Sequence, residues 1–104
     1  MEVLKLKLDL HVHTEYSQDS NTCIEEIVRR CCEVGLDGYA ITDHDTINGL
    51  PEALAKKSGL IVIPGIEISS RGCHILALGI NDQNKEYPKK LSMLKTVECI
   101  HEFG

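Results

Sequence analysis

Segments with the two-residue period of a strand alternate along this chain with segments that repeat at helical spacing. Leu and Val alternate with polar residues from Val3 to His13, which predicts a strand. Apolar residues then recur at helical spacing over 24–34, and Gly35 is placed to end that helix. Thr22 followed by Glu25 has the form of a capping box at its start. This alternation indicates an α/β fold with right-handed crossovers and a mainly parallel sheet.

The rest of the chain continues the same order of elements. Gly38–Thr42 is short and apolar enough for a buried strand, and Pro51 and Gly59 bracket a second helix. Three more strands are predicted over 60–63, 66–69 and 73–78, the first two separated by Pro64 and Gly65, and a last helix is predicted to start at Pro88. Functional loops of such a sheet gather at the carboxyl ends of its strands.

The length of the chain limits how much of a barrel it can form. Its 104 residues suffice for one domain with one hydrophobic core. A complete (β/α) barrel needs roughly 200 residues or more, so this length holds at most about half of one. We therefore expect a single domain over 1–104.

Composition argues against several classes of protein. Eleven Lys and Arg stand against 16 Asp and Glu, a net charge of −5, so strong nonspecific binding to nucleic acid is not expected. We find no apolar run long enough for a membrane helix and no signal-peptide pattern at the amino end. The five cysteines form no C-x-x-C pair, which disfavours a zinc ribbon or a disulfide framework. We expect a cytoplasmic protein with reduced thiols.

Histidines and carboxylates concentrate where the predicted strands end. His11 and His13 are two residues apart on one strand, so both rings leave the same face and can bind one metal ion. The loop that follows this strand adds Asp19, and the later strands and their ends add His44, Glu67 and His74. This mixture of nitrogen and oxygen donors suits Zn²⁺, Mn²⁺ or Fe²⁺ better than Ca²⁺.

Taken singly, these residues also have ordinary structural explanations. An H-x-H pair occurs on half-exposed strands, and His74 has the surroundings of a core histidine. Asp43 and Asp45 hold positions typical of turn or helix-cap residues. His101 suits a surface position near the end of the last helix. The interpretation as a metal site therefore depends on the six residues together.

Several motifs, taken in chain order, resemble the PHP family, named for polymerase and histidinol phosphatase. They are Asp9-Leu10-His11-Val12-His13-Thr14, Ser17 with Asp19, Ala40-Ile41-Thr42-Asp43-His44-Asp45-Thr46, Pro64-Gly65-Ile66-Glu67-Ile68, and His74-Ile75-Leu76. The resemblance covers essentially the whole chain. It implies about half of a distorted (β/α)₇ barrel, a hydrolase of phosphate esters, and up to three bound metal ions.

The resemblance also implies metal ligands. His11 and His13 match ligands of a first metal, and Glu67 matches a carboxylate that bridges the first and second metals. His74 matches a ligand of the second metal. Asp19 and His44 match ligands of the third metal. With His44, the residues His11, His13 and Glu67 would support catalysis through a metal-activated water.

Two further residues are expected to assist this site. Asp43 has no ligand role in the family pattern, and we expect it to orient an imidazole. Arg71 is close to His74 in sequence and is a candidate for pairing with a substrate phosphate, although a solvated arginine in a hairpin is the alternative.

Family members continue past the last helix to a His-Pro motif and an Asp-x-His motif that complete the metal sites. We expect the domain to be truncated before these motifs, and weak or no hydrolysis by the 104 residues alone. The first hypothesis is a metal-dependent phosphoesterase acting on a nucleotide or a small phosphorylated molecule. The alternative is a metal-binding or interaction module without catalysis of its own, completed by self-association or by a second chain.

Overall fold

Strands and helices alternate through the part of the chain that the computed structural model describes, residues 5–80, 87 and 89–103. The elements in order are β1 (Leu8–Val12), α1 (Ile24–Val34), β2 (Gly38–Ile41), α2 (Leu50–Ala55), β3 (Ile61–Ser70), β4 (Cys73–Leu78) and α3 (Met93–Phe103). No helix among these residues is long and apolar enough to cross a membrane.

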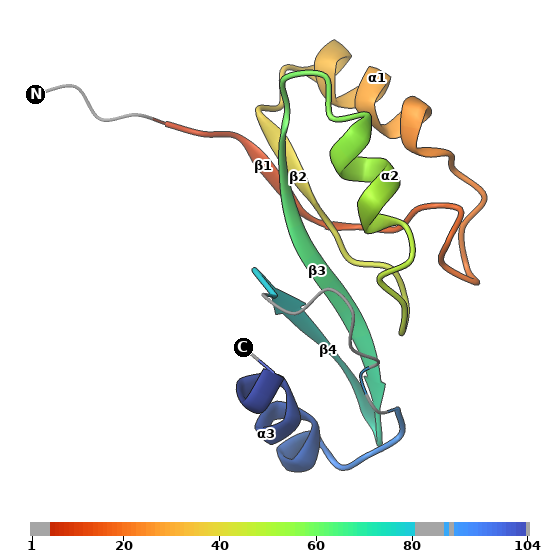
Figure 1. Cartoon of the computed structure of the whole chain (residues 1–104), viewed down its shortest axis with the longest axis vertical. Helices are drawn as coiled ribbons and strands as arrows, with labels where there is room; N and C mark the ends of the chain where they lie inside the picture. Colours follow the sequence, from red (N-terminus) through yellow and green to blue (C-terminus); the bar gives the residue numbers. More distant parts are fainter. Residues whose placement is uncertain (1–4, 81–86, 88, 104) are drawn as a thin grey trace, which may run out of the picture.

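The strands form one curled sheet in the order β1-β2-β3-β4. β1, β2 and β3 run parallel, and β4 returns antiparallel to β3 as a hairpin. The α/β fold with a mainly parallel, half-barrel sheet is therefore as predicted. Figure 1 shows α1 and α2 on one side of this sheet and α3 beside the β3–β4 hairpin.

Two apolar clusters hold the helices on the sheet. The larger one joins α1 and α2 to β2 through the buried residues Ile24, Ile27, Cys31, Tyr39, Ile41, Leu50, Ala53 and Leu60. The smaller one lies at the hairpin and contains Ile66, Ile68, Ala77, Ile80 and Tyr87, with Ile100 of α3 packed against it. Burial of these side chains orders the sheet, because removal of apolar area from water is the main favourable term in folding.

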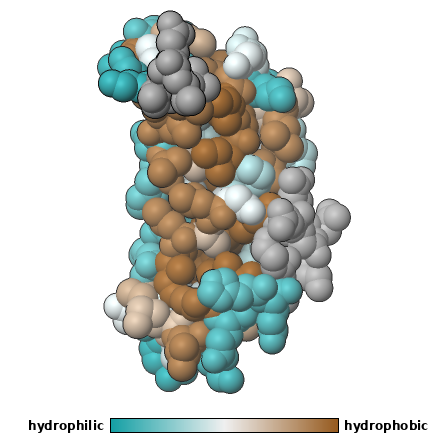
Figure 2. All heavy atoms as spheres, turned by 90° about the vertical axis from the view of Figure 1, so that its left-hand side faces the viewer, coloured by the Kyte–Doolittle hydropathy of each residue, from teal (hydrophilic) through white to brown (hydrophobic). Residues whose placement is uncertain are grey.

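The opposite face of the sheet is apolar and exposed. Figure 2 shows apolar atoms spread over the side of the molecule that turns away from α1 and α2. Large aliphatic side chains with 39–44% exposure occur on β1, β3 and β4: Leu10, Ile61, Leu76 and Leu78. Parallel sheets usually have both faces covered, so this face is unusual for a folded domain.

A β-bulge interrupts the regular alternation predicted for the first strand. Asp9 lies opposite Tyr39 and Val12 opposite Ile41, so two residues of β1, Leu10 and His11, face a single residue of β2. Asp9 and His11 therefore do not share one face, as strict alternation had indicated. Val12 packs against the cluster under α1 and α2, so the neighbouring His11 lies on the other face of the sheet, and the extra residue breaks the period between Asp9 and His11.

Two other local predictions were wrong. β3 continues through Pro64 and Gly65, because Pro64 is the last residue paired with β2 and the next residue already pairs with β4. The predicted capping box does not form at the start of α1. The N-cap residue is Cys23 rather than Thr22, and it makes no side-chain hydrogen bond to the helix. The Thr22 carbonyl accepts from the Glu15 N–H.

The sequence predicted where the first helix ends and where the last helix begins. Gly35 ends α1 in the left-handed conformation, with φ of 79°, as predicted. The last helix, α3, begins at Met93, and its predicted start at Pro88 lies outside the described residues.

Candidate metal centre

Glu67 lies at the middle of a cluster of imidazoles. Its side chain extends from β3 and is 5% exposed. The Nε2 atoms of His11 and His13 lie 2.6 and 2.7 Å from Glu67 Oε1. His74 Nδ1 lies 2.8 Å from the other carboxylate oxygen, Oε2. One buried carboxylate thus joins residues from β1, the loop after β1, and β4.

A second group of side chains adjoins the first. His13 Nδ1 lies 3.1 Å from both oxygens of Asp19. His44 Nε2 lies 3.3 Å from Asp19 Oδ2 and 3.6 Å from Glu67 Oε2. The rings of His13 and His44 meet edge to face, with centroids 4.8 Å apart. The structure therefore brings all six candidate ligands into one continuous cluster.

Three overlapping groups within this cluster have the geometry of metal sites. They are His11, His13 and Glu67; His13, Asp19 and His44; and His44, Glu67 and His74. In each group the donor atoms lie within 4.8 Å of one another. The buried His44 Nδ1 has no hydrogen-bond partner among the described residues. Imidazole nitrogens and carboxylate oxygens at this spacing fit a divalent transition metal ion.

The two carboxylates of the cluster stay ionised because of their neighbours. Burial acts to raise the pKa of Glu67, but hydrogen bonds from His11 and His13 outweigh it and hold that pKa below its usual value. A hydrogen bond from Ser17 is the main cause that lowers the pKa of Asp19. Both groups can therefore act as anionic ligands at neutral pH.

Among the described residues, the Asp43 carboxylate accepts hydrogen bonds from Thr14 and not from an imidazole ring. Its Oδ1 accepts from the Thr14 N–H at 2.5 Å, and its Oδ2 accepts from the Thr14 hydroxyl at 2.8 Å. Asp43 and Thr14 are 1% and 0% exposed. Burial raises the pKa of Asp43, while the bonds from Thr14 oppose that shift. Asp43 thus holds the backbone just after His13, and its expected role in orienting an imidazole would act through this segment.

Two residues beside the cluster were missed as supporting residues. The Ser17 hydroxyl donates to Asp19 Oδ1 at 2.5 Å and accepts from the His44 N–H at 3.0 Å. Asp45 accepts from the backbone and hydroxyl of Ser69. Ser17 belongs to a quoted motif, so its place in the motif was a usable signal. Nothing in the sequence pairs Asp45 with Ser69.

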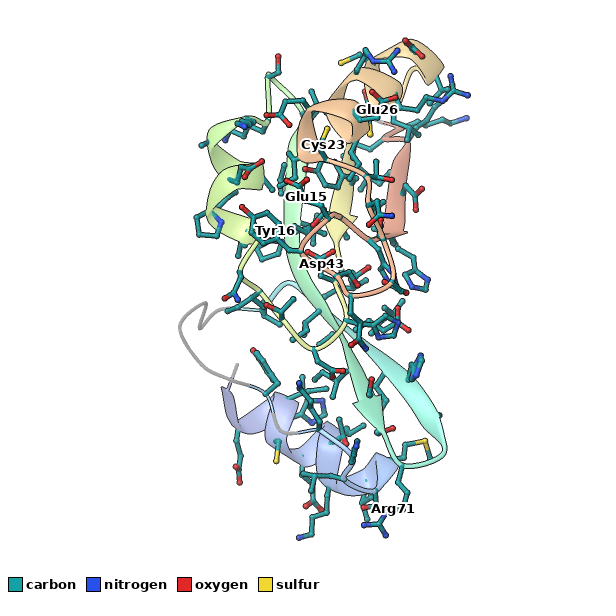
Figure 3. The ribbon with its side chains drawn as sticks, turned by 90° about the vertical axis from the view of Figure 1, so that its right-hand side faces the viewer. Glu15, Tyr16, Cys23, Glu26, Asp43 and Arg71 are labelled. Atoms are coloured by element: carbon teal, nitrogen blue, oxygen red, sulfur yellow. The ribbon has the colours of Figure 1, made fainter. Side chains whose placement is uncertain are left out.

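Arg71 and His101 lie apart from the cluster. Figure 3 shows Arg71 at the turn between β3 and β4, at the other end of the hairpin region from Asp43. Its side chain is exposed. His101 lies in the last turn of α3 and is exposed, as predicted.

Several known proteins are similar in sequence to this chain. The family described as "PHP domain" matches residues 9–98. A 5'-3' exoribonuclease of Haemophilus influenzae is 37% identical over 102 residues, covering 92% of this chain and 36% of that protein. A phosphoribosyl 1,2-cyclic phosphate 1,2-diphosphodiesterase of Eggerthella lenta is 38% identical, covering 71% of this chain and 31% of that protein. The chain thus spans about a third of the length of these two relatives.

A solved structure agrees with these matches. It is a protein of Bifidobacterium adolescentis, classed by inference as a metal-dependent phosphoesterase, and it superposes with a TM-score of 0.68 at 33% identity. The match covers 83% of this chain and 32% of the other. Sequence and structure therefore point to one family.

Proposed function

The chain belongs to the PHP family, and from this premise we propose that its histidine-carboxylate cluster supports metal-dependent hydrolysis of phosphate esters. The observation that carries the proposal is the set of three overlapping donor groups, two of which include Glu67. Relatives named for an exoribonuclease and a cyclic phosphodiesterase agree with a nucleotide or a small phosphorylated molecule as substrate.

Each donor group has a proposed part in holding metal. His11 and His13 would bind one ion together with Glu67, and Glu67 would share a second ion with His74. Asp19 and His44 would bind a third. Zn²⁺, Mn²⁺ and Fe²⁺ all suit these donors. When bound, such ions lower the pKa of a water molecule toward neutrality and neutralise phosphoryl oxygens.

The residues of the chain set the charge of this site. Four imidazoles are neutral ligands, whereas Glu67 and Asp19 contribute one negative charge each. A shell rich in imidazole leaves more positive charge for an anionic substrate than a shell of carboxylates would. Arg71 stays a proposed contact for a more distant substrate phosphate, because it lies at the hairpin turn.

Metal binding tests the first step of the proposal. The protein is freed of metal, dialysed against Mn²⁺, and analysed for metal content. We expect bound Mn²⁺ in the native chain and little in the combined His11→Ala and His13→Ala variant. His101→Ala is the matched control, since it removes an exposed histidine outside the cluster. Equal, negligible metal in the native and double-variant proteins would refute the proposal.

Hydrolysis separates the enzyme from its alternative. Phosphate release from nucleoside monophosphates and bisphosphates is measured with Mn²⁺, and Glu67→Gln gives the background. Release above that background supports the phosphoesterase. Release equal to it, with Mn²⁺ bound, supports a metal-binding module without catalysis of its own.

The exposed apolar face favours self-association or a second chain as part of that alternative. Leu76 and Leu78 lie on it with 39% and 43% exposure. Sedimentation velocity of the native protein and of Leu76→Lys tests self-association, and a monomer at every concentration would contradict it.

A cytoplasmic location stays a prediction. It agrees with the five cysteines, which are free in the structure.

A further inference from the structure

The loop after β2 runs beside β3 as if it were a continuation of the parallel sheet. The Glu67 N–H donates to the Asp43 carbonyl at 3.0 Å, and the Asp45 N–H donates to the Glu67 carbonyl at 2.9 Å. These two bonds place His44 in register with Glu67 as an isolated parallel bridge. The mutual position of the two candidate ligands therefore depends on how firmly this loop is held against β3.

Asp45 holds the loop at its far end. Its Oδ1 accepts from the Ser69 N–H and its Oδ2 from the Ser69 hydroxyl, each at 2.7 Å. The backbone of Asp45 has φ of 55°, in the left-handed region that few residues other than Gly, Asn and Asp enter. Asp45 is not a helix cap, since the N-cap of α2 is Gly49.

We propose that Asp45 is a positioning residue of the metal centre: its hydrogen bonds to Ser69 hold the loop against β3 and so keep His44 and Glu67 in register. Its two hydrogen bonds reach the residue two places beyond Glu67 on β3, and its own N–H binds Glu67 directly. Asp45 belongs to none of the three donor groups, so it acts through other residues.

The geometry of the centre leaves little room for this loop to move. His44 is shared by two of the three donor groups, and its Nε2 already lies 3.3 and 3.6 Å from its carboxylate neighbours. Binding constellations work only within roughly 0.5 Å of their productive geometry. Release of the loop from Ser69 would shift His44 relative to Glu67 and weaken both groups that include His44.

Mn²⁺ affinity and amide exchange together test the proposal, which rests on the proposed function only in its metal-binding part. Asp45→Ala removes both hydrogen bonds to Ser69, and Asp45→Gly removes them while keeping the left-handed backbone accessible. We expect both to weaken Mn²⁺ binding by about 10- to 100-fold, the usual loss when a residue that supports a metal ligand is removed. Asp45→Asn can still accept from the Ser69 N–H and donate to its hydroxyl, so it should bind Mn²⁺ nearly as the native protein does.

Asp37→Ala is the matched control. Asp37 also accepts a backbone N–H across strands, from Lys7 at 2.8 Å, but it lies at the opposite end of the sheet from the metal centre. We expect unchanged Mn²⁺ affinity in this variant. Native affinity in Asp45→Ala, or an equal loss in Asp37→Ala, would overturn the proposal.

Two further measurements keep the proposal testable in every case. If Asp45→Ala does not fold, Ser69→Ala is used in its place, because it removes only the hydroxyl donor. We expect a smaller loss of Mn²⁺ affinity from this variant. Unchanged affinity would count against the role of the Asp45–Ser69 hydrogen bonds. If the native protein binds no Mn²⁺, the proposed function fails. Exchange of the Glu67 amide, measured by NMR without metal, then decides. Faster exchange in Asp45→Ala than in Asp37→Ala supports the positioning role, and equal rates refute it.

Discussion

Replacement of the buried Asp43 by Ala should destabilise the protein strongly. The Asp43 carboxylate is the acceptor for the backbone N–H and the hydroxyl of Thr14, and both residues are almost fully buried. Asp43→Ala leaves these two donors without a partner and out of reach of water. Each buried donor left unsatisfied costs about 1–3 kcal/mol, so the free energy of unfolding should fall by about 2–6 kcal/mol. Such a loss is a large part of the stability of a small domain.

Two companion variants isolate the cause of this loss. Asp37→Ala removes an exposed carboxylate that accepts a single backbone N–H from Lys7, where water can replace it. It should cost less than about 1 kcal/mol. Asp43→Asn keeps the shape, accepts the Thr14 N–H and donates to the Thr14 hydroxyl, so its cost should lie well below that of Asp43→Ala.

Urea unfolding followed by circular dichroism measures these differences, with metal removed beforehand. A double-mutant cycle of Asp43→Ala with Thr14→Val should show a coupling energy of about 0.5–3 kcal/mol, because the two residues are in direct contact. The reasoning is refuted if Asp43→Ala costs no more than Asp37→Ala. It is refuted equally if the effects of Asp43→Ala and Thr14→Val are additive.

Three further predictions concern acid, close packing and metal removal. Because the pKa of Glu67 is lowered from 4.5 by folding, its contribution to stability is complete above pH 4.5 and is lost as the pH falls through the lower folded value; urea titrations of metal-free Glu67→Gln should show a flatter acid loss. Gly38→Ala would place a Cβ atom 2.2 Å from the Ile61 carbonyl oxygen, and this variant should lose cooperative urea unfolding. Gly72→Ala is the control: its Cβ atom would lie in open space, and at φ of 83° it should lower the free energy of unfolding by only about 1–2 kcal/mol. Added Mn²⁺ at 100 times its dissociation constant should stabilise the native protein by about 2.7 kcal/mol, and a chelator should reverse the rise in melting temperature; no change would contradict a native metal site.

The order of elements could be predicted because it depends on local periodicity. Helical spacing up to Gly35 and the apolar run of β4 are properties of neighbouring residues, and both elements form where expected. The β-bulge at Leu10 and His11 could not be predicted, because a two-residue pattern looks the same whether or not one extra residue is inserted in the pairing. The passage of β3 through Pro64 was missed because it depends on a change of partner strand.

The same distinction applies to the metal centre. The ligand candidates were found because their residue types and their places at strand ends are visible in the chain. The partners of the supporting residues Asp43 and Asp45 are not visible, because Asp43 and Thr14 are 29 residues apart and Asp45 and Ser69 are 24 apart. Only the folded sheet pairs them.

These supports have a consequence for how variants of the centre should be interpreted. Asp43 and Asp45 flank His44 and hold different segments: Asp43 holds the chain after β1, whereas Asp45 holds β3. Asp43 is deeply buried, so its loss acts first on stability, while the partly exposed Asp45 should act first on the register between His44 and Glu67. Loss of metal binding with a smaller fall in the free energy of unfolding is therefore expected from Asp45→Gly, which keeps the left-handed backbone of that residue accessible. For Asp43→Ala, we expect any loss of metal binding to be accompanied by a fall in the free energy of unfolding. If the two variants behave alike, the loop moves as one unit and neither carboxylate has a separate role.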